Sequence, residues 1–316
     1  MKKLLELKNI SKNFGNKSAV SEVSFSVAQG EVVGFLGPNG AGKTTTMRML
    51  TGFLQTNSGE IEILGNLVTA KNRATLNRHI GYLPEGAPLY PDMTAHDFLN
   101  FLGNVRGLDA NKLRERMEFV VETLSLSEVL HQNIETLSKG YKRRVCFAQA
   151  ILHDPEILIL DEPTDGLDPL QKADVRNLIK KLSPTKAILL STHILDEVEA
   201  ICGRALVIAA GRIVAEGTSI DLRAHDPIAK SIVLRTQQSA LETSSALLNN
   251  QSFARVEIED PHTCRVFLAK NVDISELHNL IDKNSWRVLM LFEEPGKLES
   301  AFKNLVSNSI VMKESA

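Results

Sequence analysis

The chain has 316 residues, a formal net charge of −2 and charged side chains at 23% of its positions. Because single hydrophobic cores stop growing at about 250–300 residues, this length favours two domains. The interspersed charges give no strongly basic face, which argues against nucleic acid as a partner. The longest apolar runs are far shorter than the roughly 18 residues that a membrane-spanning helix needs, so we expect no transmembrane segment in this chain.

Neither a signal peptide nor a disulfide framework is expected. The start of the chain briefly resembles a signal peptide, but Glu6 and Lys8 interrupt the apolar segment that such a peptide requires. The cysteines, Cys146, Cys202 and Cys264, are odd in number and lack the spacing of a metal site. We therefore expect a cytosolic protein whose cysteines are reduced packing residues.

The first ~220 residues alternate short strand-like and helix-like stretches, which is typical of an α/β sheet with crossover helices. Leu4–Leu7 and Val20–Val27 are predicted to be strands of an antiparallel flap. The next strand, Glu31–Leu36, is followed at once by a glycine-rich segment and then by a helix from Lys43 to about Leu50. A strand, a glycine-rich turn and a helix in this order are the context of a phosphate-binding loop.

The glycine-rich segment also has the residue pattern of such a loop. It reads Gly37-Pro38-Asn39-Gly40-Ala41-Gly42-Lys43-Thr44. Glycines let successive backbone N–H groups turn inward around an anion, and the helix start adds unbonded N–H groups and the positive end of its dipole. Lys43 is expected to reach the β- and γ-phosphates, and the Thr44 hydroxyl to bind magnesium. The predicted nucleotide contacts are Gly37, Pro38, Asn39, Gly40, Ala41, Gly42, Lys43, Thr44 and Thr45.

A helical subdomain, at about residues 86–150, is predicted to interrupt the sheet-forming sequence. The strands and the polar helix before it are Gly59–Leu64, Lys71–Arg78 and Ile80–Leu83. Thr94 forms a capping box with Asp97, and helical periodicity then continues through Phe98–Val105 and Leu113–Leu124. The sheet is expected to resume after this insertion.

Three short apolar runs after the insertion are predicted to be buried parallel strands. They are Ile157–Leu160, Ala187–Leu190 and Ala205–Ile208, and a hairpin strand, Ile213–Glu216, follows them. The first run delivers Asp161 and Glu162 at its carboxyl end, where α/β sheets place their ligands. We expect Asp161 to hold magnesium and Glu162 to orient and deprotonate the attacking water. The alternative is a solvated loop edge, which the phosphate loop upstream disfavours.

The composition becomes polar at residues 221–228, which we interpret as a linker between domain 1–220 and a small α+β domain, 229–316. The elements predicted after it are, in order, a strand at Ser231–Arg235, a helix at Leu241–Leu248, strands at Val256–Glu259 and Arg265–Leu268, a helix at Ile274–Ile281, a strand at Arg287–Phe292 and a helix at Lys297–Val306. This order matches a split-βαβ, ferredoxin-like unit.

Upstream of the carboxylate strand lies a segment that reads Leu137-Ser138-Lys139-Gly140-Tyr141, followed by a predicted helix at Lys142–Leu152. With it, the first domain resembles the nucleotide-binding subunit of an ABC transporter. That family has a phosphate loop, a Leu-Ser-Gly-Gly-Gln signature, an apolar Asp-Glu strand and a downstream histidine, and all of these occur here in the family's order. The resemblance implies a P-loop NTPase fold of the ABC type. Among the branches of this family, the chain most resembles export-type subunits whose permeases are separate chains.

The resemblance assigns roles to further residues. Ser138 and Gly140 would contact the γ-phosphate of ATP held by the opposite subunit of a head-to-tail dimer. His193 matches the switch histidine that contacts the γ-phosphate, although a lone histidine after a strand is more often structural. Asp168 matches a residue that links the two subunits' sites, and Phe14 matches the aromatic residue that stacks on adenine. Without the resemblance, Asp168 is consistent with an ordinary turn and Phe14 with a core residue.

Three positions depart from the family pattern. Lys139 replaces a signature glycine, Tyr141 replaces the signature glutamine, and Glu85 stands where the family places a glutamine that senses magnesium and water. A carboxylate at position 85 would bind magnesium more strongly and would disfavour a nearby γ-phosphate. The following segment, Gly86–Asp92, is expected to form the edge of a groove that receives a permease helix, or else a rigid loop.

Basic residues crowd the start of the helix that follows the signature. They are Lys139, Lys142, Arg143 and Arg144. Because a helix dipole disfavours cations at this end, the cluster indicates an anion nearby, with a solvated basic face as the alternative.

The sequence thus favours an ATPase subunit that uses ATP and magnesium, dimerises with itself or with a second ABC subunit, and drives a separate integral-membrane permease. Such a subunit would lie peripherally on the cytoplasmic face of the membrane. One alternative is a soluble ABC ATPase of translation or DNA repair, which by resemblance would bring a second nucleotide domain or a long coiled-coil insertion. Another is an ATP-binding regulatory protein, against which the intact pair Glu162 and His193 argues.

Overall fold

The computed structural model describes residues 2–86 and 88–314. It divides into two compact units, residues 1–219 together with those from Val306 onward, and Ile220–Leu305. The domain boundaries expected from the sequence, 1–220 and 229–316, place the whole C-terminal end in the accessory domain and stay a prediction. Within the described residues, no helix is both long and apolar enough to cross a membrane.

The first unit is built on a six-stranded sheet with the order β10-β9-β3-β8-β7-β6. The strands are β3 (Val32–Leu36), β6 (Ile80–Leu83), β7 (Ile157–Asp161), β8 (Ala187–Thr192), β9 (Arg204–Ala209) and β10 (Arg212–Gly217). All neighbours are parallel except β9 and β10. Ile159 packs into one core and Leu160 into the other, which explains why these strands are apolar throughout. The carboxyl ends of β3, β8 and β7 therefore lie together at one edge of the sheet.

An antiparallel flap covers one face of this sheet. Its strands are β1 (Lys3–Phe14), β2 (Lys17–Ala28), β4 (Ser58–Ile63) and β5 (Asn66–Leu67), in the order β2-β1-β4-β5. Helix α1 (Lys43–Thr51) shares their core, where Met47 and Leu50 pack with Leu5 and Ile10. The flap predicted from the sequence is confirmed, with longer strands. The polar helix predicted next is shorter than expected, namely α2 (Arg73–Leu76) followed by a single 3₁₀ turn, Asn77–His79.

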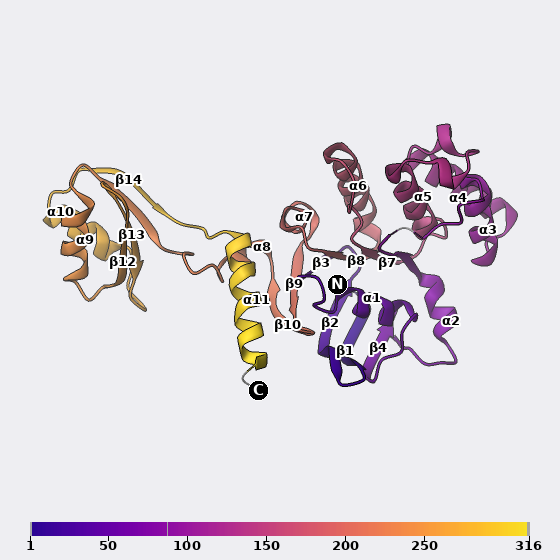
Figure 1. Ribbon diagram of the computed structural model, residues 1–316, viewed down its shortest axis with the longest axis horizontal. Coiled ribbons are helices and arrows are strands. Elements are labelled where there is room, and N and C mark those ends of the chain that lie inside the picture. Colours follow the sequence, from indigo (N-terminus) through magenta and orange to yellow (C-terminus); the bar gives the residue numbers. More distant parts are fainter. Residues whose placement is uncertain (1, 87, 315–316) are drawn as a thin grey trace. The chain divides into compact units, whose positions relative to one another are not determined.

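The helical insertion lies between β6 and β7, as predicted. Its main helices are α3 (Ala95–Val105), α4 (Ala110–Thr123) and α5 (Lys139–Ile151), and they gather apart from the flap strands (Figure 1). The predicted helix start at Thr94 is confirmed, because the Asp97 N–H donates to Thr94 Oγ1 at 3.1 Å and Thr94 Oγ1 contacts Asp97 Oδ2 at 2.8 Å. Helices α6 (Pro169–Leu182) and α7 (Leu195–Ile201) connect the later strands of the sheet.

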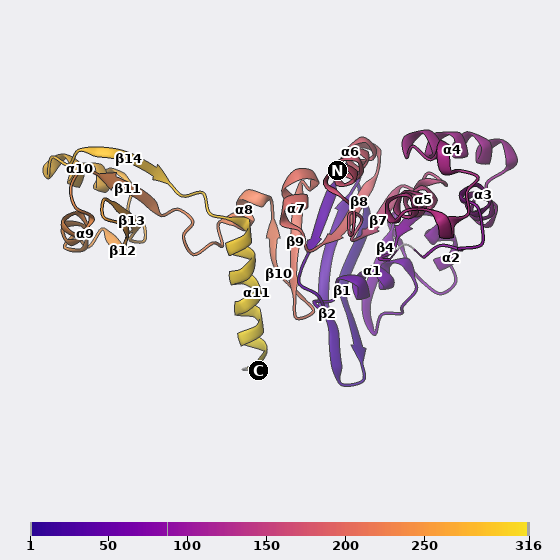
Figure 2. The same ribbon diagram turned by 45° about the horizontal axis from the view of Figure 1, so that its top comes forward.

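The second unit contains a four-stranded antiparallel sheet with the order β12-β13-β11-β14. Its elements are β11 (Ile232–Thr236), α9 (Ala240–Leu248), β12 (Phe253–Asp260), β13 (Thr263–Leu268), α10 (Ser275–Lys283) and β14 (Val288–Glu293), with α8 (Ser219–Arg223) before them. Helix α11 (Leu298–Glu314) follows them, and its residues from Val306 onward belong to the first unit. Leu247 of α9 and Leu277 of α10 pack on Ile232 and Val266 of the sheet. Figure 2 shows both helices beside these strands. The predicted split-βαβ order is confirmed.

Candidate nucleotide site

The loop after β3 has a backbone that only glycine permits at two positions. A Cβ added at Gly37 would lie 2.5 Å from the Ile208 carbonyl oxygen, and one at Gly42 would lie 2.7 Å from that of Ala19. Gly42 also has a φ of 112°, a conformation that L side chains rarely adopt. No side chain caps α1 at its start, so the first N–H groups of this helix point toward the loop without intrahelical acceptors. The loop therefore has the geometry of an anion cradle.

Lys43 is buried between this loop and a carboxylate. Its Nζ donates to the Gly37 carbonyl oxygen at 2.7 Å and lies 3.5 Å from Glu162 Oε1. Both side chains are about nine-tenths buried or more. The ammonium and the carboxylate therefore compensate each other's charge where water is largely excluded.

The end of β7 presents Asp161 and Glu162 in different environments. Asp161 is fully buried: its Oδ1 accepts from Ser191 Oγ, whereas its Oδ2 has no hydrogen-bond partner among the described residues. Glu162 has a φ of 49°, and its Oε2 lies 2.9 Å from His193 Nδ1. These distances bring the phosphate-loop lysine, the second carboxylate and the histidine together, and their predicted roles with nucleotide and water stay predictions.

A buried carboxylate that the sequence analysis missed holds the turn carrying His193. Glu197, on α7, accepts from Thr192 Oγ1 at 2.8 Å and also from Thr164 Oγ1. The Ile194 N–H in turn donates to Thr192 Oγ1 at 3.0 Å. Glu197 therefore joins the segment after β7 to the segment after β8. The only local signal was an acidic residue in the first turn of a helix, which usually indicates a favourable dipole interaction.

Arg143 makes a second connection that the sequence analysis did not foresee. Its guanidinium is 5% exposed and donates to the carbonyl oxygens of Pro84, Asp161, Glu162 and Pro163. Burial lowers the pKa of this group, and it forms no ion pair within the described residues. Arg143 thus ties α5 to the ends of β6 and β7.

Within one chain, the cations at the start of α5 have partners in the protein itself, so the interpretation that an anion lies near this helix start stays a prediction. Lys142 Nζ donates to the Glu135 carbonyl oxygen at 2.9 Å, and Arg144 pairs with Asp174 at 3.0 Å. Lys139 is exposed, with Nζ 4.0 Å from Asp165. Asp165 and Asp174 lie far along the chain from these lysine and arginine residues, and the sequence alone does not place them beside the helix.

Replacing Arg143 by lysine should lower steady-state ATP turnover by roughly tenfold or more. A single ammonium cannot contact carbonyls at the ends of two strands at once, and small displacements of catalytic groups lower the rate strongly. ATP affinity should change much less, since Lys43 and the loop stay in place. Phosphate release and calorimetry measure the two quantities. Lys142→Arg, an exchange that keeps the charge at the half-buried neighbouring residue, is the matched control. Wild-type turnover in a folded Arg143→Lys protein would show that Arg143 has no positioning role.

The signature residues lie outside the cavity that contains Thr44 and Asp161. Ser138 is exposed and begins α5, where its Oγ accepts from the Tyr141 N–H at 3.3 Å. Gly140 is buried, and a Cβ there would lie 2.7 Å from the Gln171 side-chain amide. Within one chain, therefore, these residues do not join the phosphate loop.

Two other residues singled out from the sequence have structural contacts of their own. Asp168 begins α6 and accepts from the Gln171 N–H at 2.8 Å, which is a helix cap. Phe14, at the end of β1, is 51% exposed, and Lys12 Nζ lies 5.6 Å from its ring centroid. An exposed aromatic ring is compatible with stacking on a base, and both nucleotide roles stay predictions.

A cavity of about 820 Å³ brings together Thr44, Glu85 and Asp161. These residues supply hydroxyl and carboxylate oxygens, which magnesium prefers, and Asp161 Oδ2 is a buried acceptor without a partner among the described residues. In residues 2–86 and 88–314, no three His, Cys, Asp or Glu side chains gather as a metal site. The residues present therefore fit a magnesium ion that takes most of its ligands from water and phosphate.

Comparison with known proteins identifies related sequences. A family model described as "ABC transporter" matches residues 20–165. The linearmycin resistance ATP-binding protein LnrL of Bacillus subtilis (strain 168) is 34% identical over 318 residues, covering 97% of this chain and 99% of that protein. The Nod factor export ATP-binding protein I of Paraburkholderia xenovorans (strain LB400) is 34% identical over 87% of this chain and 92% of its own length.

Solved structures share the fold of the first unit. An ATP-binding subunit of an ABC transporter is 33% identical with a TM-score of 0.65, over 70% of this chain and 92% of that one. A bacterial ABC transporter cassette solved as a dimer is 23% identical with a TM-score of 0.63, over 68% of this chain and 98% of that one. The fold expected from the sequence is thereby confirmed.

Proposed function

Because this chain belongs to the family of ABC transporter ATP-binding proteins, we propose that its site hydrolyses ATP through Glu162 and that two copies of the site act together on a membrane permease. The chain is an ATPase subunit of a transporter. The observation that carries the proposed mechanism is the position of the Glu162 carboxylate between Lys43 Nζ and His193 Nδ1.

The chain's own residues divide the reaction between phosphate binding and proton transfer. The N–H groups of the loop and the Lys43 ammonium hold the phosphates. As Lys43 moves onto the phosphates, Glu162 loses its compensating cation and becomes the base that accepts a proton from water. The water oxygen bonds to the γ-phosphorus, the bond to the bridging oxygen breaks, and ADP retains that electron pair. His193 is engaged by Glu162 through Nδ1, so Nε2 is its ring nitrogen directed at the γ-phosphate.

Magnesium would be held by the Thr44 hydroxyl and, through water, by Asp161, with Glu85 as a further carboxylate on the same cavity. When bound, it neutralises charge on the β- and γ-phosphates. Residue 85 is a glutamate at the position where the family pattern has a glutamine.

Two chains complete each site in this proposal. Ser138 is exposed at the start of a helix, and neither it nor Gly140 lines the cavity beside the phosphate loop of the same chain. A head-to-tail dimer would bring the Ser138 hydroxyl and the first N–H groups of α5 to the γ-phosphate of the opposite copy. ATP then closes the dimer, and hydrolysis opens it. A second, different ABC subunit would serve in place of an identical copy.

The permease is proposed to dock at the cavity edge formed by the segment from Glu85 to Asp92. Phe53 and Tyr90, both more than half exposed, line this cavity together with Leu102. Residue 87, part of the segment singled out from the sequence, lies outside the described residues. Exposed aromatic side chains around a concave surface suit an inserted helix. Because ATP is supplied by the cytosol, this docking would place the subunit peripherally at the cytoplasmic face of the membrane.

Export is the proposed direction. The two relatives compared above are named for Nod factor export and for linearmycin resistance, and the second covers nearly all of this chain. The substrate itself is selected by the permease, so its identity does not follow from these residues.

Affinity purification of the full chain from detergent-solubilised native membranes tests the partner. We expect a polytopic membrane protein to be recovered, and Tyr90→Asp to reduce that recovery. Leu67→Asp, at an exposed apolar residue on the flap, is the matched control and should not reduce it. Recovery of ribosomes or DNA in place of a membrane protein would favour a soluble ATPase of translation or repair.

A further inference from the structure

The two edge strands of the second unit's sheet differ in charge. The edge strand β12 carries Arg255, Glu257, Glu259 and Asp260 among its eight residues. The opposite edge strand, β14, has five apolar residues in a row, from Val288 to Phe292. Natural proteins usually protect edge strands with charged residues, because the unpaired backbone groups of an edge can bind another strand. β12 has this protection, and β14 lacks it.

The apolar side chains of β14 are also exposed. Leu289 is 56% exposed, Phe292 43% and Met290 40%, and only β11 pairs with this strand among the described residues. A register shift leaves Leu289 without a partner residue on β11, and such a bulge bends the strand outward. An apolar, half-exposed edge of this length is an interaction surface or an aggregation site.

The charges at the two ends of β14 are complementary to those of a second copy of the same strand. Arg287 precedes the apolar run and Glu293 ends it, and neither side chain forms an ion pair within residues 2–86 and 88–314. If two copies of β14 run antiparallel, the basic end of each strand lies beside the acidic end of the other. Parallel pairing would instead place like charges together. The strand is therefore complementary to itself in the antiparallel direction only.

We propose that β14 of two copies pairs antiparallel about a two-fold axis, which joins the two four-stranded sheets into one continuous sheet. This interface goes beyond the proposed ATPase cycle, because it needs no nucleotide. It would hold two subunits together when their ATP sites open, so that the next closure occurs between tethered partners at a high effective concentration.

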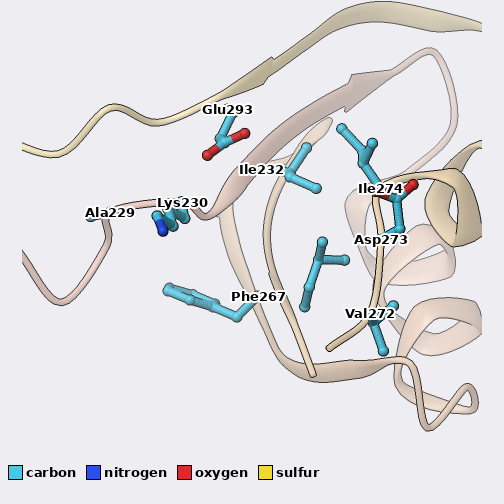
Figure 3. Close-up of a pocket in the computed structure, with 9 residues that line it drawn as sticks. Ala229, Lys230, Ile232, Phe267, Val272, Asp273, Ile274 and Glu293 are labelled. Atoms are coloured by element: carbon cyan, nitrogen blue, oxygen red, sulfur yellow. The ribbon is translucent and has the colours of Figure 1, made fainter. Parts of the chain in front are cut away.

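The surroundings of Glu293 support this arrangement. Glu293 stands at the rim of a cavity of about 390 Å³, whose charged lining residues are Glu293, Asp273 and Lys230. Figure 3 shows Glu293 on the same side as Lys230, above the ring of Phe267. Two carboxylates and one ammonium leave this rim with an excess negative charge. A guanidinium arriving from Arg287 of the second copy would compensate it.

Sedimentation of the full chain without nucleotide tests the interface. We expect the wild-type chain to be dimeric at micromolar concentration, and Met290→Asp to weaken the dimer by at least roughly tenfold in dissociation constant, because the carboxylate would be desolvated among apolar side chains. Ile258→Asp, at a residue 48% exposed on the charged edge β12, is the matched control and should remain dimeric. Both variants should keep wild-type circular dichroism and ATP turnover.

Exchange of the end charges tests the direction of pairing. Arg287→Glu should weaken the dimer, and the same chain carrying both Arg287→Glu and Glu293→Arg should recover it. A monomeric wild-type chain, a Met290→Asp dimer of unchanged strength, or failure of the double exchange to restore pairing would each overturn the proposal. These results are separable from the ATPase assignment, since wild-type turnover is measured on the same samples and a loss of turnover alone would contradict only the proposed catalytic site.

Discussion

Replacing Glu162 by glutamine should abolish measurable ATP turnover while ATP binding persists. Glutamine has nearly the same shape and can still contact His193, but its amide cannot accept the proton of the attacking water. Positioned general bases typically contribute about 10²–10⁴-fold to rate, so phosphate release should fall by roughly that factor. Because the substitution also removes the negative charge that lies 3.5 Å from Lys43, the ammonium becomes more available to the phosphates.

The same variant should accumulate an ATP-bound dimer, which size-exclusion chromatography with ATP detects. Glu156→Gln is the matched control: it makes the same chemical change just before β7, at the opposite end of the strand from Glu162, where the carboxylate is about half exposed and lies 3.0 Å from His79. We expect wild-type turnover in that control. Steady-state turnover at the wild-type rate in Glu162→Gln would refute the assignment of Glu162 as the base.

The sequence predicted the parts of the site that depend on local pattern. The phosphate loop is a contiguous segment, so its glycines could be recognised from spacing alone, although the carbonyl oxygens that crowd Gly37 and Gly42 belong to Ile208 and Ala19 elsewhere in the chain. Asp161 and Glu162 follow a short apolar run, so their place at the carboxyl end of a buried strand could be deduced from the order of residues. His193 was found in the same way after β8.

The parts that were missed depend on contacts between segments far apart in the chain. Arg143 donates to a carbonyl 59 residues away and Glu197 accepts from a hydroxyl 33 residues away, and no local period predicts either pairing. The partner of Arg144 could not be predicted for the same reason, since Asp174 lies 30 residues further along the chain. Polar residues are placed by tertiary contacts that a single sequence does not encode in its spacing.

In the second unit, the order of the strands in the sheet likewise could not be predicted from the sequence. The sequence predicted the strands and helices of this unit from β11 onward and missed only α8, where it predicted a linker, and the apolar run of β14 was visible as a strand. Whether that strand lies at the centre or at the edge of the sheet depends on long-range pairing with β11. The contrast between the charged edge and the apolar edge is therefore a structural finding, although every residue in it was known beforehand.

Replacing Lys43 by alanine should weaken ATP binding by roughly 10- to 100-fold, because a hydrogen bond to a charged group contributes about 1.5–3 kcal/mol and each 1.4 kcal/mol is tenfold in affinity. Lys43→Met should lose a similar amount. Methionine keeps most of the buried aliphatic stem and removes only the ammonium, so the pair separates lost charge from lost packing. Isothermal calorimetry measures both affinities.

Lys181→Ala, at an exposed lysine near the end of α6, is the control for loss of one positive charge from the protein and should bind ATP as the wild type does. If Lys43→Ala bound weakly and Lys43→Met bound normally, the stem rather than the ammonium would matter, and the proposed role in phosphate binding would be wrong. Loss in both variants has a further consequence for catalysis. It would show that the cation that compensates Glu162 is the same one that ATP requires, so that nucleotide binding itself frees the base.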